Sequence, residues 1–264
     1  MKHLFIVNPV AGRQKPEDKL RLIHEAIDRL PAEKRESEEF EVYVTAAPMD
    51  ACAYIKEAAK KAQELRIYAC GGDGTLNECV NGAAGLSNVA VTHFPCGTGN
   101  DFIKMFGPDK DRFFDLTELM NGEVRPIDVI DCNGRYSVNI CSMGLDARIG
   151  TDVHKYSGIP LVGGAAGYVV SLAANYFKGI TTAMTARTEG LTCGPELNLV
   201  CVCNGRFYGG GFNPTNDARP DDGYMDVLIV SGVSRLSLLG ALMSYAKGKY
   251  RSCPQYITLS LIHI

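Results

Sequence analysis

A glycine-rich turn at residues 71–75, with the sequence Gly-Gly-Asp-Gly-Thr, constrains the fold of this chain more than any other feature. It follows the apolar run 67–70 and leads directly into a predicted helix over 76–84. Glycine has no Cβ, so the turn lets backbone N–H groups approach a ligand closely, and the helix N-terminus adds partial positive charge. One glycine suffices for an ordinary strand-to-helix turn, so this arrangement favours phosphate binding over a purely structural role. Asp73 stands where a carboxylate can hold a metal ion that bridges phosphates.

Strand and helix signals alternate through residues 1–124. Short apolar runs predict strands, Pro16 opens the first predicted helix, and Asp50 is the predicted N-cap of the second. This alternation predicts an α/β domain with a parallel sheet flanked by helices. The predicted strands are 4–7, 40–45, 67–70 and 89–94; the predicted helices are 16–30, 50–64, 76–84 and shorter segments to about Met120; residues 31–39 are a predicted loop.

The pattern becomes strand-rich from Val124 onward, which predicts a domain boundary near Arg125 and a β-rich, sandwich-like domain over residues 125–264. Asn133-Gly134 predicts a hairpin turn between strands at 127–131 and 136–141. The uncharged stretch 161–177 is too short and too weakly hydrophobic for a membrane span, and it predicts a buried helix. Further predicted strands are 183–187, 197–203 and 225–230.

Composition excludes several classes of function. The chain has 264 residues and a formal net charge of −3, so bulk electrostatics gives no attraction to nucleic acid, and we expect no nucleic-acid partner. Its 10 cysteines contain no Cys-x-x-Cys pair, and the N-terminus has no signal-peptide layout. We therefore expect reduced, mostly buried thiols in a cytoplasmic protein, and neither disulfides nor a zinc site.

Two more loops of small residues follow predicted strands, 8–13 after the first and 95–101 after the fourth. Open parallel sheets bind ligands beyond the carboxyl ends of their strands, so we expect these two loops to converge with the turn at 71–75. The chain contains no G-x-x-x-x-G-K-[ST] sequence, and no G-x-G-x-x-G opens a helix after the first strand. These absences exclude a P-loop protein and a dinucleotide-binding fold of the usual type.

With these motifs the chain resembles the diacylglycerol kinase catalytic fold, in its bacterial soluble lipid kinase branch. Gly-Gly-Asp-Gly-Thr alone is shared with NAD kinases, whereas Gly-Thr-Gly-Asn-Asp at 97–101 points to the lipid kinases. Sphingosine kinases share the overall plan but depart from Gly-Gly-Asp-Gly-Thr. The resemblance extends from residue 1 to about residue 230 and rests on the segments 8–12, 71–78, 95–102, 139–146 and 221–227.

The resemblance implies a two-domain enzyme that transfers the γ-phosphoryl group of ATP to a lipid hydroxyl. The implied acceptor is diacylglycerol, the implied product is phosphatidic acid, and the implied cofactor is Mg²⁺. Such an enzyme is cytoplasmic, meets its lipid substrate at the inner face of the membrane, and can form a homodimer. Two alternatives stay open, which are an NAD kinase-like enzyme and a non-catalytic nucleotide-binding protein.

The resemblance also implies roles for particular residues. Asp73, Asp101 and Asp128 would organise catalytic Mg²⁺ through water, with Arg13 and Lys104 as nearby cations, although family members often have lysine where Arg13 stands. A second, structural Mg²⁺ would be bound by the side chain of Asp222 and the carbonyls of Arg219 and Tyr224, whereas the residues by themselves favour a β-turn at 221–223. The implied nucleotide-site residues are Asn8, Pro9, Val10, Ala11, Gly12, Thr45, Gly72, Asp73, Gly74, Thr75, Leu76, Asn77, Glu78 and Thr98.

The family's general base is an acid in a C-terminal Asp-Gly-Glu-type segment, and no Asp or Glu follows Asp226 here. We therefore expect the chain to be truncated at its C-terminus. The last six residues, 259–264, are also encoded by a transposon-end adapter used in sequencing libraries, which favours a non-native end. A genuine six-residue strand at 259–264 is the alternative.

Overall fold

The four strands predicted for the N-terminal part form one parallel sheet in the computed structural model, which describes residues 1–156 and 165–264. The strands are β1 (Lys2–Val7), β2 (Glu39–Val44), β3 (Leu65–Gly71) and β4 (Val89–Pro95). They lie in the order β2-β1-β3-β4, and every neighbouring pair is parallel. The predicted parallel sheet is therefore confirmed.

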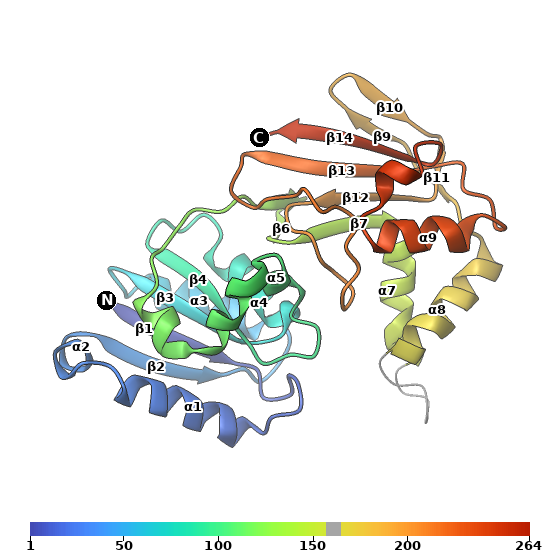
Figure 1. The fold of residues 1–264 in the computed structure, drawn as a ribbon. Helices are drawn as coiled ribbons and strands as arrows, with labels where there is room; N and C mark the ends of the chain where they lie inside the picture. The colour runs from blue at the N-terminus through green and yellow to red at the C-terminus, as the bar shows by residue number, and fades with distance from the viewer. Residues whose placement is uncertain (157–164) are drawn as a thin grey trace. The chain divides into compact units, whose positions relative to one another are not determined.

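Helices cover both faces of this sheet (Figure 1). α3 (Asp50–Ala59) and α4 (Asp73–Ala83) pack on one face, and α1 (Pro16–Asp28) and α6 (Leu116–Asn121) pack on the other. Successive side chains of a strand point to opposite faces, so the buried residues of β1 alternate between the two cores. This is the predicted α/β arrangement.

Two local predictions differ from the structure, whereas the helical segments predicted after β4 are present. The loop predicted at 31–39 contains a short helix, α2 (Ala32–Ser37), because its residues are good helix formers and none needs burial. Asp50 is the first residue of α3 rather than its N-cap; its carboxylate accepts from the Ala46 N–H at 2.7 Å. The segments after β4 are α5 (Asp101–Lys104) and the 3₁₀ helix η1 (Gly107–Phe114), followed by α6.

The predicted hairpin at Asn133-Gly134 is present between β5 (Ile130–Cys132) and β6 (Arg135–Ser137), with both strands shorter than expected. Both turn residues have positive φ, 54° for Asn133 and 78° for Gly134. A two-residue hairpin turn of this type requires that conformation, which asparagine and glycine adopt at little cost. The local sequence therefore determines this turn.

The chain divides into two compact units, residues 1–138 and 139–264. The division falls after the β5–β6 hairpin, whereas the predicted boundary near Arg125 falls before it. The hairpin belongs to the first unit because Asn81 on α4 bonds to the backbone N–H and C=O of Tyr136 at 2.9 and 2.8 Å. Val138 is also buried in the first unit's core.

An antiparallel sheet forms the centre of the second unit. Its strands are β7 (Ile140–Gly144), β12 (Leu199–Cys203), β13 (Tyr224–Val230) and β14 (Ile257–His263), in the order β14-β13-β12-β7. β14 pairs with β13 along its whole length. Residues 257–263 therefore form the edge strand of this sheet, while the non-native end stays a prediction.

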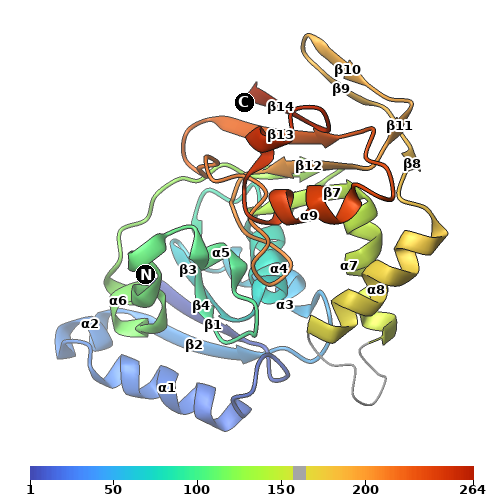
Figure 2. The same cartoon turned by 45° about the vertical axis from the view of Figure 1, so that its right-hand side comes forward.

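Different elements pack on the two faces of this second sheet. α7 (Leu145–Tyr156) and α9 (Leu238–Ala246) lie on one face, with the 3₁₀ helix η2 (Tyr250–Ser252) after α9. Two small hairpin-like sheets pack on the other, which Figure 2 shows from a second direction. This layering confirms the predicted β-rich, sandwich-like fold. The small sheets pair β8 (Thr182–Ala183) with β11 (Glu196–Leu197) and β9 (Ala186–Thr188) with β10 (Leu191–Cys193).

The helix predicted within 161–177 is α8 (Ala165–Lys178), while 161–164 lie outside the described residues. It is not buried on all sides, because Ser171 and Asn175 face α7 whereas Phe177 is 77% exposed. In the part of the chain that the structure describes, no helix has the length and apolar character needed to cross a membrane. All 10 cysteines are free thiols; most are buried, but Cys132 is exposed.

Candidate nucleotide-binding site

The three predicted ligand loops meet at the carboxyl edge of the parallel sheet. β1 has β2 on one side and β3 on the other, so the chain changes direction between β1 and β3. Ligands of open α/β sheets bind at such a switch point. The Asn8 Nδ2 donates to the Thr75 Oγ1 at 3.0 Å, which joins the loop after β1 to the start of α4.

Close backbone contacts explain the glycines in these loops. Gly12 has a φ of +68°, and a Cβ on it would lie 1.9 Å from the carbonyl oxygen of Cys96. A Cβ on Gly97 would lie 2.5 Å from the Cα of Gly72. Any side chain at these two positions would push the loops apart, so the glycines allow all three loops to touch.

The carbonyl oxygen of Gly71 ties the loops after β3 and β4 together. It accepts from the backbone N–H groups of Cys96 and Gly97 at 2.8 and 3.1 Å, and from the His93 Nε2 at 3.1 Å. Donation to a carbonyl places the His93 proton on Nε2; its Nδ1 has no partner among the described residues. The sequence reasoning missed His93, whose only signal is a polar residue inside an apolar strand.

We expect the first unit to lose stability as the pH decreases below about 6.5, which is the ordinary pKa of histidine. Burial lowers the pKa of His93, and burial likewise lowers the pKa of His3 despite its Glu38 partner at 2.8 Å. Both imidazoles are therefore neutral when folded and take up protons on unfolding, so the free energy of unfolding decreases by up to about 1.4 kcal/mol per pH unit for each.

Urea unfolding of the protein between about pH 8 and about pH 5 measures this slope. His93→Gln keeps a donor for the Gly71 carbonyl and should reduce the slope. His24→Gln, at an exposed position on α1, is the matched control and should leave it unchanged. An identical slope in the wild type and His93→Gln would contradict the assignment.

The start of α4 presents backbone N–H groups that have no partner within the helix. Gly72 is the N-cap, and the N–H groups of the first turn, at 73–75, have no earlier helical carbonyl to bond. Apart from its own turn of helix, a Cβ on Gly74 would meet no atom of the described residues within 4 Å, so the space above this turn is open. Free N–H groups and the positive end of a helix dipole together form an anion-binding site.

Two of the three predicted catalytic carboxylates lie beside this turn. The Asp73 Oδ1 accepts from the Phe102 N–H at 3.1 Å, and the Asp101 Oδ1 lies 2.5 Å from the Lys104 Nζ. A Cβ on Gly99 would lie 3.2 Å from the Asp73 Oδ2 and 3.8 Å from the Asp101 Oδ2, so the second oxygens of both carboxylates flank Gly99.

This oxygen pair fits Mg²⁺, which is commonly bound in proteins by one or two carboxylates, several waters and substrate phosphates. The predicted third member, Asp128, lies half-buried in the irregular segment before β5, and its role stays a prediction. Within residues 1–156 and 165–264, no group of three or more His, Cys, Asp or Glu side chains is arranged to hold a metal directly.

The other predicted nucleotide-site residues lie at different depths. Arg13 and Val10 are exposed in the loop after β1 and Thr98 in the loop after β4, whereas Thr45 follows β2 and donates its N–H to the Val7 carbonyl at 2.9 Å. Leu76 is different. Its side chain packs in the hydrophobic core, so it anchors α4 instead of facing a ligand. The remaining predicted positions lie on the loop after β1 (Pro9, Ala11) and on α4 (Asn77, Glu78).

Lys19 is a further residue that the sequence reasoning missed. Its side chain is fully buried on α1, and its ammonium group donates to the carbonyls of Asn8 and Ala11 at 2.8 and 2.7 Å. It therefore holds the loop after β1 in shape and places a positive charge behind it. Lys19 shares a helical stripe with the buried residues Ile23 and Ala26, and a lysine at such a core position was the available signal.

The segment predicted to bind a second Mg²⁺ is a turn in the structure. The Asp222 Oδ1 accepts from the Tyr224 N–H at 3.0 Å, and Gly223 has a φ of +75°. Arg219 lies exposed just before this turn. A backbone N–H bonded to the Asp side chain two residues earlier is an Asx turn, which has the form of the turn favoured by the residues alone. The second metal site stays a prediction.

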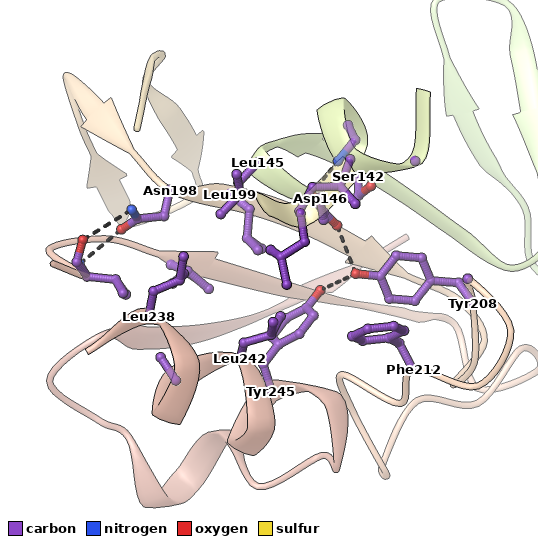
Figure 3. A pocket seen from close by; sticks show the side chains of 18 of the residues that line it. Ser142, Leu145, Asp146, Asn198, Leu199, Tyr208, Phe212, Leu238, Leu242 and Tyr245 are labelled. Atoms are coloured by element: carbon purple, nitrogen blue, oxygen red, sulfur yellow. Dashed lines mark hydrogen bonds between the residues drawn. The ribbon is translucent and has the colours of Figure 1, made fainter. Parts of the chain in front are cut away.

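The second unit contains an apolar cavity of about 290 Å³, shown in Figure 3. Its walls come from β7, β12 and β13 on the sheet side and from α7 and α9 on the helix side. The close-up shows several leucines around the cavity, and at one end the Tyr208 hydroxyl bonds to Asp146 and to the Tyr245 hydroxyl.

Comparison with known proteins identifies the class. Residues 2–132 match the family described as diacylglycerol kinase catalytic domain, and residues 139–260 match the YegS C-terminal NAD kinase beta sandwich-like domain. The two units thus correspond to the two domains of a lipid kinase. This chain belongs to the diacylglycerol kinase catalytic domain family, as the resemblance predicted.

Individual relatives agree with this assignment. "Diacylglycerol kinase" of Bacillus subtilis (strain 168) is 28% identical over 255 residues, which cover 93% of this chain and 79% of that protein. "Probable lipid kinase YegS-like" of Pseudomonas aeruginosa is 30% identical over 227 residues, or 82% of this chain and 71% of that protein. The crystal structure of "a putative diacylglycerol kinase from Bacillus anthracis str. Sterne" is 25% identical, has a TM-score of 0.71, and aligns with 98% of this chain and 83% of its own.

Proposed function

We propose that this protein transfers the γ-phosphoryl group of ATP to the hydroxyl of diacylglycerol, giving phosphatidic acid. The observation that carries the proposal is the open first turn of α4, flanked by Asp73 and Asp101, in a member of a lipid kinase family. The enzyme would meet its acceptor at the cytoplasmic surface of a membrane. A homodimer is compatible with this role.

The first unit would bind and neutralise the triphosphate. The N–H groups at 73–75 would contact phosphate oxygens, and Lys104 of α5 and Arg13 of the loop after β1 would add positive charge. Asp73 and Asp101 would hold Mg²⁺ through water, and the bound ion would neutralise charge that develops on the transferred group. Phosphoryl transfer has a loose transition state, so this positioning and neutralisation supply most of the rate enhancement.

The second unit would receive the apolar part of the acceptor. Its cavity is lined mainly by aliphatic side chains, which suits a lipid and gives little to bind the polar surface of NAD. This composition favours the lipid kinase over the NAD kinase-like alternative.

The direct test is a transfer assay with radiolabelled ATP and Mg²⁺, offering diacylglycerol in mixed micelles and NAD in separate reactions. Labelled phosphatidic acid is the expected product. Labelled NADP would support the NAD kinase-like alternative. ATP binding with no labelled product would support the non-catalytic alternative and overturn the proposal.

Gly74→Ala is expected to weaken ATP binding at least about tenfold while leaving the fold stable. Among the described residues the new methyl group meets no atom outside its own helical turn, so it would occupy the space that the phosphates would take. Alanine also favours a helix, by up to about 1 kcal/mol over glycine. Calorimetric titration with Mg-ATP and thermal unfolding measure the two effects.

Gly240→Ala is the matched control, because Gly240 also lies in a helix and its added Cβ would also meet no described atom within 4 Å outside that helix. It should be at least as stable as the wild type and bind ATP normally. Equal ATP affinity in both variants would show that the phosphates do not contact the first turn of α4.

A further inference from the structure

The outer side of α9 is apolar although it is open to solvent. α9 contains no charged residue, and on its inner side Leu238, Ala241 and Tyr245 are buried in the core of the second unit. On the outer side Met243 is 50% exposed, and Leu236, in the turn that leads into α9, is 96% exposed. A helix that is apolar all round is normally covered on every side. The described residues leave the outer side of α9 uncovered.

The end of α8 extends this apolar surface. The Phe177 ring meets the Tyr176 ring edge-on, with 5.5 Å between the ring centroids, and the Arg235 guanidinium lies 6.0 Å from the centroid of the same Tyr176 ring. Arg235 directly precedes Leu236, so these two contacts bring Phe177 and Leu236 close together. Single exposed apolar side chains are common on protein surfaces, but neighbouring ones mark a site of interaction. We call the surface of Phe177, Leu236 and Met243 the α9 face.

Positive side chains lie at both ends of the α9 face. Residues 227–264 contain four Lys or Arg and no Asp or Glu, whereas the whole chain has a formal net charge of −3. Arg235 precedes α9, and Lys247 and Lys249 follow it. None of these three forms an ion pair with a residue that the structure describes, while the fourth, Arg251, is paired with an aspartate carboxylate at 3.0 Å. The α9 face therefore combines apolar side chains with positive charge that no carboxylate neutralises.

This combination fits the surface of a bilayer that contains anionic lipid. Apolar side chains enter the boundary between headgroups and acyl chains, and cations beside them are attracted to the negative lipid phosphates. A second copy of this chain fits less well. A two-fold interface sets the same face against itself, so it would place the unneutralised cations of one copy opposite those of the other.

We propose that the α9 face is the surface by which this protein docks on a bilayer containing anionic lipid, with Leu236 and Phe177 inserted below the headgroups. The cations at both ends of the face would lie beside lipid phosphates. The inference rests on the proposed function, since a kinase whose acceptor is a membrane lipid has to reach a bilayer. It assigns that contact to one face of the second unit.

Fluorescence locates the docking surface, because the chain contains no tryptophan. Leu236→Trp places a single reporter on the α9 face, and Phe114→Trp places one at an exposed position of η1 in the first unit. Each protein is titrated with vesicles of phosphatidylcholine and phosphatidylglycerol in equal amounts. The Leu236→Trp emission should shift to shorter wavelength and be quenched by lipids with brominated acyl chains, whereas the Phe114→Trp emission should not change. Vesicles of phosphatidylcholine alone should bind at least about tenfold more weakly.

Phe177→Ser combined with Leu236→Ser should weaken binding to the mixed vesicles at least about tenfold, because two apolar side chains then no longer leave water on docking. Phe114→Ser is the matched apolar control and should bind normally. All three side chains are exposed, so their replacement should leave the thermal stability of the protein nearly unchanged. Co-sedimentation with the vesicles measures the binding.

Lys247→Gln combined with Lys249→Gln removes two cations from one end of the α9 face and should also weaken binding at least about tenfold. Lys56→Gln combined with Lys60→Gln is the matched control, since these exposed lysines lie on α3 and directly after it. This pair changes the net charge by the same amount and should leave binding unchanged. Equal weakening by both pairs would show that net charge determines binding and would overturn the inference.

Two results of the fluorescence experiment would also overturn it. The first is a Leu236→Trp emission that vesicles leave unchanged, or that changes no more than the Phe114→Trp emission. The second is a Leu236→Trp emission that shifts with protein concentration alone, which would assign the α9 face to contact between copies of this chain.

The docking surface and the proposed function fail in different ways. If lipid is phosphorylated but the double variant of Phe177 and Leu236 binds vesicles normally, the docking surface alone is wrong. If Leu236→Trp inserts into the mixed vesicles but no lipid is phosphorylated, the α9 face binds a bilayer and the proposed kinase activity is wrong.

Discussion

Replacing Asp73 by asparagine is expected to lower the rate of phosphoryl transfer by about a hundredfold to a thousandfold. The asparagine side chain keeps an oxygen that can accept the Phe102 N–H, which Asp73 accepts at 3.1 Å, so the local structure should persist. What disappears is the negative charge at the start of α4, next to Gly99, where Asp73 would hold Mg²⁺. Loss of its favourable interaction with the helix dipole costs only about 0.5 kcal/mol of stability.

Initial rates of phosphatidic acid formation and thermal unfolding, measured on the same preparations, separate the two effects. Asp111→Asn removes an exposed carboxylate of η1 and should leave both quantities unchanged. An Asp73→Asn enzyme with normal turnover would remove this carboxylate from the mechanism. A variant that unfolds near room temperature would assign Asp73 a mainly structural role.

Lys19→Met is expected to destabilise the protein by about 2 kcal/mol and to weaken ATP binding at least about tenfold. The substitution leaves the carbonyls of Asn8 and Ala11 without their donor, and each partly buried carbonyl then loses a charge-assisted hydrogen bond. The loop after β1 also loses the positive charge behind it. Because that loop contacts the start of α4 through Asn8 and Thr75, the loss reaches the anion-binding turn.

Urea unfolding and calorimetric titration with Mg-ATP measure both consequences. Lys15→Met is the control, since Lys15 is exposed at the start of the same helix. If Lys19→Met is less stable but binds ATP normally, Lys19 supports the fold and contributes nothing to the nucleotide site.

Features with a strong local cause were predictable from the sequence. The apolar runs predicted the parallel strands, and Pro16 predicted the first residue of α1. Asn133-Gly134 predicted the hairpin turn. The glycines at 12, 72 and 97 were predicted as ligand-loop residues. The structure shows why they are glycines, because a Cβ at each would lie close to the backbone of a neighbouring loop. These features depend on neighbouring residues, which a single sequence displays directly.

Features that depend on distant partners were not predictable in the same way. Asn81 and Tyr136 are separated by 55 positions, so nothing local placed the β5–β6 hairpin in the first unit. The position of Lys19 on the buried stripe of α1 was visible in the sequence, but the two loop carbonyls that its ammonium group meets were not. Leu76 was assigned to the nucleotide site because it belongs to the motif, but the helix turns its side chain into the core.

The three donors on the Gly71 carbonyl bear on how quickly a ligand can bind. A loop that must order itself around an incoming molecule slows association, because most encounters separate before the loop has closed. Here the loops after β3 and β4 are already fastened to one another in the protein alone. A triphosphate would thus bind to a preformed surface. Its association rate would depend on diffusion and electrostatic steering, because these loops need not fold first.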